Sequence, residues 1–305
     1  MAFTAKDVQA LREMTGVGMM DCKKALVETN GDMDAAIKYL RERGLAAAAK
    51  KAGRIAADGL VYANVYEDGT GVVLEVNSET DFVAKNEEFK KFVEDVARVI
   101  AEKAPADVDA LLELNYPGTD LTVADVQRDK ILVIGENIKI RRFERISGGF
   151  NVTYVHMGGK IGVLVNMEVS DSITDKEAVT ELGKDIAMQV AAMNPRFLSP
   201  EDVDSETYES EKQILMAQVM QEGKPEAIAE KIVAGRMNKF YEESCLLKQA
   251  FVKDSKLSVE KHVEAVAKEL GATIAVKRFV RFEKGEGIEK RSDNLADEVA
   301  KMIGK

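Results

Sequence analysis

Residues 71–86 read GVVLEVNSETDFVAKN, and this stretch passes from a strand pattern through a turn into a helix pattern. The apolar run at 71–77 indicates a buried strand. At the junction a carboxylate, Asp81, stands beside a large aromatic side chain, Phe82. Helical spacing favours Phe82 as the first core residue of the next helix, whereas a turn position also suits a side chain that points outward to a partner. Both interpretations stay open at this point.

The sequence around this junction predicts one structural unit. A hairpin is expected over 59–77, because residues 67–69 (Glu-Asp-Gly) supply a turn between two strand patterns. A helix is expected over 81–103, with Asp81 capping its free amides, and a strand over 136–146. The apolar stripe of that helix consists of Phe89, Phe92, Val93, Val96 and Ile100.

A similar order of elements recurs further along the chain. A second hairpin with a glycine turn is expected over 150–169, a helix over 176–193 and a strand over 273–285. The two closing strands share the spacing Arg-Phe-x-Arg, at residues 142–145 and 278–281. The repetition predicts an internal duplication of a β-hairpin, helix and strand subdomain.

Helical patterns precede and interrupt this pair of subdomains. A capping box at residues 4–7 opens a first helix, a second is expected over 19–29, and a third from Asp32 to Gly44. Three short helices predict a small bundle similar to a ubiquitin-associated module, followed by an Ala-rich linker over 45–59 that is either helical or extended. Two further helices are expected around a turn at Gly223 and Pro225, as an antiparallel hairpin that projects from the body. The second of these is lined by Ile228, Ile232, Val233, Met237 and Phe240.

The predicted fold class is therefore α+β. The predicted domains are a three-helix N-terminal module with its linker (1–54), a first core subdomain (55–146), a second core subdomain (147–200 and 241–285), an inserted helical hairpin (201–240) and a C-terminal helical module (286–305), whose helix starts near Asn294.

Composition and charge favour a protein partner over a nucleic acid. The 305 residues include 43 Lys or Arg and 53 Asp or Glu, a net charge of −10, which disfavours non-specific binding to nucleic acid. The charge is uneven: residues 1–54 hold ten basic and seven acidic residues, or +3, which leaves −13 for the rest. A basic module joined to an acidic body is better suited to another protein.

Several kinds of chemistry are disfavoured by what the sequence lacks. Two cysteines, Cys22 and Cys245, and two histidines, His156 and His262, make no disulfide framework, thiolate metal cluster or histidine-rich metal site. No glycine-rich phosphate loop occurs, because Gly159-Lys160 is followed by Ile161. We therefore expect a binding protein that is no enzyme and holds neither metal nor cofactor. The lack of a signal-peptide pattern and of a long apolar run predicts a cytoplasmic protein without membrane contact.

Five blocks of the sequence resemble one known family, in that family's order. The chain is similar to bacterial translation elongation factor Ts in LREMTGVGMMDCKKAL (11–26), VNSETDFVAKN (76–86), IGENIKIRR (134–142), HMGGKIGVLV (156–165) and GKPEAIAEKIVAGRMNKF (223–240). Residues 103–130 and the C-terminal end match more loosely.

The resemblance implies a guanine-nucleotide exchange factor for the GTPase elongation factor Tu. In this family an aspartate–phenylalanine pair reaches toward the nucleotide site of the GTPase and disturbs its bound Mg²⁺. Carried over to this sequence, that role falls on Asp81 and Phe82, flanked by Thr80 and Val83. Further partner contacts implied by the resemblance are Arg12, Met19, Met20, Lys23, Lys51, Ile134, Gly135 and His156. Self-association through the helical hairpin is also open.

Other interpretations of the same residues stand beside this one. Met19 and Met20 would ordinarily fill a helical bundle, Lys23 and Lys51 would be solvated charges, and residues 134–135 would form a turn. One alternative function is an RNA-binding translation protein with a basic strand face made by Arg141, Arg142, Arg145, Arg278 and Arg281. A second is an adaptor whose N-terminal module binds ubiquitin-like folds.

Overall fold

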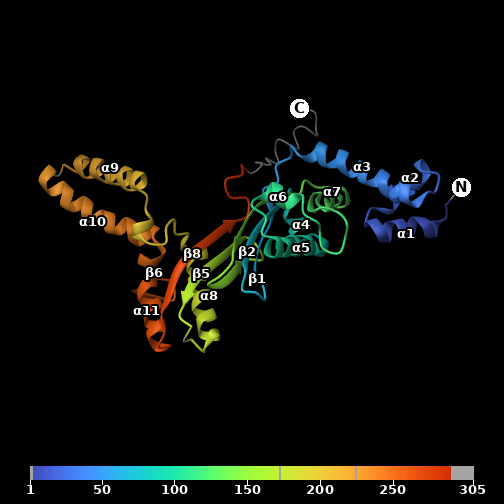
Figure 1. Ribbon diagram of the computed structural model, residues 1–305. Coiled ribbons are helices and arrows are strands. Elements are labelled where there is room, and N and C mark those ends of the chain that lie inside the picture. Colours follow the sequence, from blue (N-terminus) through green and yellow to red (C-terminus); the bar gives the residue numbers. More distant parts are fainter. Residues whose placement is uncertain (1–2, 172, 224, 290–305) are drawn as a thin grey trace. The chain divides into compact units, whose positions relative to one another are not determined.

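The computed structural model describes residues 3–171, 173–223 and 225–289, and it combines helices with short sheets (Figure 1). This confirms the α+β class. The described residues separate into two compact units. The first contains the residues up to Tyr62, those of Leu74–Phe143, and those from Glu283 onward; the second contains Ala63–Val73 and Glu144–Phe282. The predicted helix near Asn294 lies outside the described residues.

The first unit is built from helices around a three-stranded sheet. Its elements are α1 (Ala5–Thr15), α2 (Met19–Glu28), α3 (Met33–Lys51), β1 (Asp58–Val65), β2 (Gly71–Ser78), α4 (Asp81–Ala84), α5 (Glu87–Lys103), α6 (Val108–Leu112), α7 (Val123–Ile134) and β3 (Lys139–Ile146). The end of β1, the start of β2 and the end of β3 belong to the second unit.

Helices α1 to α3 begin where the sequence predicted. The Asp7 carboxylate accepts a hydrogen bond from the Thr4 amide at 2.6 Å, which completes the expected capping box. Asp32 caps α3 by accepting from the Ala35 amide at 2.9 Å. The three helices bury a shared apolar cluster that includes Val8, Leu11, Cys22, Leu26, Ala36 and Leu40.

The predicted end of the third helix at Gly44 is wrong, because α3 continues to Lys51. Gly44 is buried within the helix, and its neighbours there are Arg128 and Asp129 of α7. The alanines that follow have high helix propensity, so nothing local ends the helix. The packing of α7 against α3 therefore extends a helix that the sequence pattern alone would stop.

Helix α7 was not predicted, although the sequence carries signals for both of its ends. Thr122 and Asp125 form a capping box at its start. Gly135 ends it in the left-handed conformation, with φ of 86°, and donates its amide to the Ile131 carbonyl. The two capping signals indicate this helix better than the spacing of its apolar residues does.

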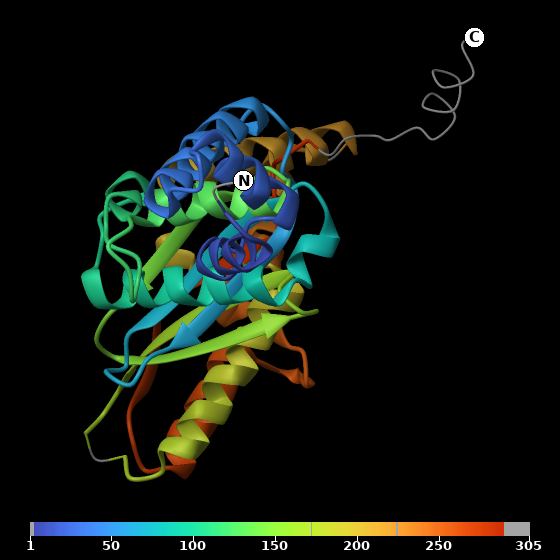
Figure 2. The same cartoon turned by 90° about the vertical axis from the view of Figure 1, so that its right-hand side faces the viewer.

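The sheet of the first unit has β2 at its centre, between β1 and β3. Every residue of β2 is buried, and helix α5 lies over this sheet (Figures 1 and 2). The expected stripe of α5, from Phe89 to Ile100, is buried as predicted. The predicted hairpin turn is also present, since the Tyr66 amide donates to the Thr70 carbonyl at 2.9 Å.

One charged side chain lies inside this sheet. Glu75 of β2 has no solvent exposure, and its carboxylate accepts from Arg141 Nη1 at 2.9 Å and Arg142 Nε at 2.6 Å, both on β3. It also accepts from Asn77 Nδ2 at 3.0 Å and from the Gly285 amide at 2.8 Å. A carboxylate removed from water requires such partners. Glu75 thereby fastens the segment that follows the last strand to the centre of the sheet.

The second unit has a sheet of the same strand arrangement and a helical hairpin. Its elements are β4 (Phe150–His156), β5 (Ile161–Val169), α8 (Lys176–Met193), the 3-10 turn Pro200–Asp202, α9 (Ser205–Gln221), α10 (Glu226–Ser244), the 3-10 turn Leu246–Lys248, β6 (Ala250–Phe251), β7 (Asp254–Ser258), α11 (Val259–Glu269) and β8 (Ile274–Glu283).

Strand β5 lies between β4 and β8, and it pairs with β4 in antiparallel register, Val152 opposite Val165. Helix α8 packs across β4 and β5 (Figure 2). The hairpin, the helix and the closing strand were predicted within a few residues. The short strands β6 and β7 were not predicted, since they contain only two and five residues. Helix α11 was also not predicted, although Val259, Val263 and Ala267 are four positions apart and Ser258 caps its start.

Helices α9 and α10 lie side by side as an antiparallel pair (Figure 1). Their buried contact consists of Val219 on α9 and Ala229, Val233 and Met237 on α10. The three α10 residues are four positions apart and share one face. Ile228 was expected in this stripe but is 52% exposed, because it lies one position away from that face.

Among the described residues, no helix has both the length and the apolar character needed to cross a membrane.

The buried Glu75 network generates a stability prediction. Glu75→Gln should destabilise the protein by about 3 kcal/mol, because it removes the buried carboxylate that Arg141 and Arg142 share. This is the lower end of the usual range, since both Arg side chains retain some exposure. Arg142 keeps its ion pair with Glu286 at 3.0 Å. Urea unfolding at pH 7 measures the change, and Glu102→Gln on the exposed face of α5 is the matched control. Equal stability of the two variants would contradict the prediction.

The same network predicts a pH dependence. Burial raises the pKa of the Glu75 carboxyl, but the hydrogen bonds from Asn77, Gly285 and the two arginines outweigh burial, so its pKa lies below the usual value. A depressed folded-state pKa contributes stability above the unfolded pKa of about 4.3, and this contribution is lost as pH falls through the folded value. The gap in unfolding free energy between wild type and Glu75→Gln should therefore shrink below about pH 4.

Candidate functional site

Phe82 lies on a helix of a single turn and points away from the core. It is 77% exposed, whereas the next residue, Val83, is 5% exposed and packs inward. Helix α4 contains only Asp81–Ala84, so Val83 is its anchor and Phe82 is its outward face. Of the two interpretations of Phe82, the outward one is correct.

The predicted continuous helix over 81–103 is wrong, and its break explains the direction of Phe82. After α4 the chain turns at Lys85, and Asn86 caps a new helix by accepting from the amides of Glu88 (2.8 Å) and Phe89 (3.2 Å). Helix α5 then buries its apolar stripe by itself. Phe82 therefore does not share the helical register that would turn it toward the core.

Asp81 does not cap the helix, contrary to the prediction. Thr80 occupies the cap position, and the Asp81 carboxylate instead forms an ion pair with Lys85 Nζ at 3.0 Å. The hydrogen bond from Lys85 lowers the pKa of Asp81 below its usual value. The Lys85 ammonium also lies 5.7 Å from the centre of the Phe82 ring. Asp81, Phe82 and Lys85 thus form one exposed group on α4.

The predicted contact residues of the N-terminal helices are exposed. Met19 is 48% exposed and Met20 is 75% exposed, both at the start of α2, and Arg12 and Lys23 are also exposed. Met14 of α1 is 64% exposed and was not among the predicted contacts, although adjacent methionines are a common feature of adaptable binding surfaces. The structure leaves these side chains available to a partner rather than using them as bundle filling.

Lys51 and residues 134–135 belong to a different local structure. Lys51 Nζ donates to the Ile131 carbonyl at 3.1 Å, at the C-terminal end of α7, and burial together with the charge of Arg54 lowers the pKa of Lys51. Ile134 is partly buried, and Gly135 is exposed in the left-handed turn that ends α7. Lys51 is therefore neither a core residue nor a freely solvated charge.

His156 ends strand β4 of the second unit. Its Nδ1 lies 3.0 Å from the Tyr154 hydroxyl, and the residues on either side of it, Val155 and Met157, are 40% and 70% exposed. Met157 has a φ of 48° in the tight turn to β5. The exposure of Met157 was not predicted, and a large apolar residue in a strained turn is a signal that the sequence alone does not reveal.

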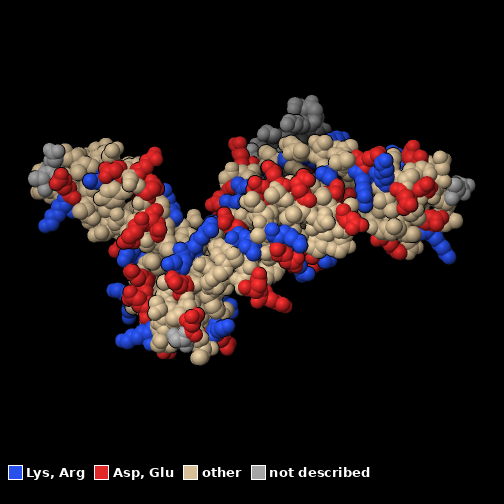
Figure 3. Space-filling model, in the orientation of Figure 1, with Lys and Arg blue, Asp and Glu red and all other residues tan. Residues whose placement is uncertain are grey.

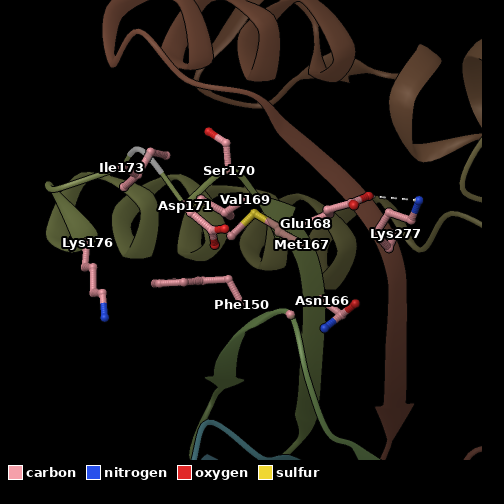
Figure 4. A pocket seen from close by; sticks show the side chains of 11 residues that line it. Phe150, Asn166, Met167, Glu168, Val169, Ser170, Asp171, Ile173, Lys176 and Lys277 are labelled. Atoms are coloured by element: carbon pink, nitrogen blue, oxygen red, sulfur yellow. Dashed lines mark ion pairs between the residues drawn. The ribbon is translucent and has the colours of Figure 1, made fainter.

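The second unit contains an open groove of about 800 Å³ (Figure 4). It is lined by Gly149, Phe150, Asn166, Met167, Glu168, Val169, Ser170, Asp171, Ile173, Lys176 and Lys277. Glu168 and Lys277 pair with each other at 3.2 Å, and the Ser170 hydroxyl accepts from the Thr273 amide at 3.1 Å. Asp171 and Lys176 also line the groove, and we assign no ligand to it. In the described part of the chain, no cluster of three metal-ligating side chains occurs.

Phe82, Met19 and Met20 are thus large apolar side chains on the surface of the first unit, and comparison with known proteins identifies the family of the chain. Residues 79–286 match the family model described as Elongation factor TS. Proteins named Elongation factor Ts from Syntrophotalea carbinolica and from Clostridium perfringens strain SM101 are 51% and 52% identical to this chain, and each match covers 99% of both sequences. The homologue from Magnetococcus marinus is 49% identical over the same share.

The chain belongs to the elongation factor Ts family. The family resemblance of the five sequence blocks is therefore confirmed, as is the class of translation elongation factors without covalent chemistry of their own.

The exposure of Phe82 generates a stability prediction with an internal control. Phe82→Ala should change the free energy of unfolding by less than about 0.5 kcal/mol, as surface substitutions do. Phe92→Ala, in the fully buried stripe of α5, should cost about 3–5 kcal/mol. Chemical denaturation of both variants measures the difference. A similar loss of unfolding free energy in the two variants would show that Phe82 is a core residue.

Proposed function

We propose that this chain is a guanine-nucleotide exchange factor that binds elongation factor Tu in its GDP form, disturbs the Mg²⁺ and phosphate site, and promotes GDP release. The proposal is carried by one observation: Phe82 is 77% exposed on a helix whose next residue is buried. Family membership supplies the partner class. Thr80, Asp81, Phe82 and Val83 are the proposed acting segment.

The energetics explain why such a small segment needs a large body. An acceleration of about 10⁴-fold requires the barrier to fall by about 5.5 kcal/mol. Burying one phenylalanine contributes about 1.5–3 kcal/mol, so Phe82 alone is insufficient. Mg²⁺ requires near-ideal octahedral geometry, so a rigid side chain that shifts its ligands weakens the site without competing for the ion. The remaining free energy must come from a wide contact surface. At equilibrium, nucleotide weakens the complex by the same factor by which the exchange factor weakens nucleotide affinity.

The wide contact is proposed to include residues of both units. Exposed Met19 and Met20 supply apolar contact from α2, with Arg12 and Lys23 as cations beside them. Ile134 and Gly135 present the turn after α7, and His156 presents the end of β4. Lys51 is included in the proposed contact because its Nζ donates to the Ile131 carbonyl. This hydrogen bond connects α3 to α7, the helix that ends at Gly135.

The finer domain layout is likewise a proposal. The cluster shared by α1, α2 and α3 supports a ubiquitin-associated-like module within residues 1–54. The common strand order of the two sheets supports two related core subdomains, 55–146 and 147–200 with 241–285. The self-contained contact between α9 and α10 supports an inserted hairpin over 201–240. Self-association through that hairpin stays a prediction, for which sedimentation of the full chain is the measurement.

A nucleic-acid partner is not proposed. Arg141 and Arg142 are engaged with the buried Glu75, and Arg278 pairs with Glu144 at 2.9 Å. On the face drawn in Figure 3, lysines and arginines are interspersed with acidic side chains. These arginines are therefore poorly suited to form a continuous basic surface, which nucleic-acid binding requires.

The central test is release of labelled GDP from elongation factor Tu. Phe82→Ala should slow the catalysed release by about tenfold or more, because a burial contribution of at least about 1.4 kcal/mol to the transition state is lost. Val252→Ala, which truncates an exposed apolar residue between β6 and β7, is the control and should exchange at the wild-type rate. A folded Phe82→Ala protein with wild-type exchange would reject the assignment.

Asp81→Ala should act through the ion. Raising the Mg²⁺ concentration should slow exchange by the Asp81→Ala variant more than exchange by the wild type, if disturbance of the Mg²⁺ site is the assisted step. The rate of GDP release as a function of Mg²⁺ concentration is the measurement. If Mg²⁺ slows GDP release equally with the wild type and with Asp81→Ala, Asp81 has no part in disturbing the Mg²⁺ site.

The helical hairpin generates a deletion prediction. All residues of its apolar cluster come from α9 and α10, so their removal leaves no cavity elsewhere in the described core. Replacing residues 205–240 with a short linker should leave the remaining protein folded and much of the exchange activity intact. Thermal unfolding and GDP release measure both effects. Loss of folding would show that the hairpin supports the second unit.

A further inference from the structure

The turn that presents α4 is held from outside by one carboxylate. Glu136 Oε2 accepts from the amides of Glu79 at 3.0 Å and Thr80 at 2.9 Å, and its Oε1 accepts from the Thr80 hydroxyl at 2.6 Å. Glu136 is 56 residues away from Thr80 in the chain. Hydrogen bonds to an ionised carboxylate are about twice as strong as neutral ones. Three of them converge on the two residues that precede Asp81 and Phe82.

A second set of bonds runs in the opposite direction. Glu79 Oε1 accepts from the Asn137 amide at 2.7 Å, and Asn137 Nδ2 donates to the Arg54 carbonyl at 2.9 Å. Asn137 is only 8% exposed. The loop before α4 and the loop after α7 are therefore joined reciprocally, each by a glutamate carboxylate that accepts from backbone amides of the other. These bonds hold Glu136 against the loop that precedes α4.

Helix α4 depends on this support because it has little of its own. It contains four residues, too few for a helix to be stable in isolation. Its cap residue, Thr80, makes no side-chain hydrogen bond to the helix, since its hydroxyl is directed to Glu136. Val83 anchors one side of the turn through burial. The hydrogen bonds at Glu79 and Thr80 restrict the rotation of α4 about that anchor.

We propose that Glu136 is the positioning residue of the Phe82 helix: its carboxylate holds Glu79 and Thr80 so that Phe82 is presented in a single direction. Glu136 acts through α4 and need not touch the partner. Gly135 makes this geometry accessible, because its left-handed conformation turns the chain from α7 toward the loop. The consequence for exchange rests on the proposed function, whereas the effect on the direction of Phe82 does not.

The direction of Phe82 is tested in the full chain without a partner. The protein contains no tryptophan, so Phe82→Trp places a single tryptophan on α4, which can be excited selectively at a longer wavelength than the tyrosines. Time-resolved anisotropy should show an added nanosecond motion when Glu136→Ala is combined with this reporter. Glu136→Gln should restore most of the rigidity, because the amide oxygen still accepts from the backbone. Glu102→Ala, on the exposed face of α5, is the matched control and should leave the anisotropy unchanged.

The consequence for exchange is tested with native Phe82. Glu136→Ala should lower the maximal rate of GDP release from elongation factor Tu by about tenfold. The concentration for half-maximal rate and the melting temperature should change little, because the wide contact and the core persist. Glu136→Gln should recover most of the rate, which a general loss of folding would not allow.

The outcomes separate the positioning role from the proposed function. Unchanged anisotropy in Glu136→Ala overturns the inference, as does a mobile fluorophore at position 82 accompanied by unchanged GDP release by Glu136→Ala. If the wild type itself fails to accelerate GDP release, the proposed function is rejected, and the anisotropy still decides whether Glu136 directs residue 82. If Glu136→Ala does not fold, Glu136→Asp, whose carboxylate is one methylene shorter, replaces it in both measurements. A rigid fluorophore and the wild-type rate of GDP release in that variant overturn the inference.

Discussion

A fully buried carboxylate is the constraint on which the first unit depends. Glu75 sits at the centre of the sheet, where an unpaired charge would be intolerable, so its neighbours are dictated. Two arginines of β3 and the amide of Gly285 meet it from segments 66 to 210 residues away in the chain. Gly285 is itself required there, because a Cβ at this position would lie 2.2 Å from the Ala57 carbonyl oxygen. One acidic side chain thus sets the third strand and the path of the chain after the last one, and it engages arginines that a nucleic acid would otherwise meet.

The second determinant is the interruption between α4 and α5. A continuous helix would carry Phe82 around the same spiral as Phe89 and Phe92, and its side chain would compete for the core. Asn86 ends that continuity by starting a new helix with its own side chain. The apolar stripe of α5 is then complete without Phe82, and the preceding turn is available for contact. A single capping residue separates the part of the segment that stabilises the fold from the part that faces outward.

Sequence patterns predicted the elements whose signals are local and missed those that depend on distant partners. The two hairpins, helix α8 and the stripe of α5 follow from periodicity and turn residues over short stretches. The end of α3 was misplaced because Gly44 was interpreted as a helix end, whereas the alanines after it favour helix and α7 packs against this glycine. Family resemblance singled out Asp81 and Phe82, but residue spacing alone pointed Phe82 inward. Glu136 was missed because nothing near it in sequence indicates that its acceptors would meet amides of Glu79 and Thr80.

The opposite orientations of Phe82 and Val83 have an evolutionary consequence. Mutations are tolerated when the stability that remains is sufficient for function, so a buried position answers to folding and an exposed one does not. Val83 is therefore under selection from the core of its own chain, and any hydrophobic residue of similar volume satisfies that demand. Phe82 contributes little to folding, so loss of stability does not oppose its replacement. The two adjacent positions are therefore subject to different constraints.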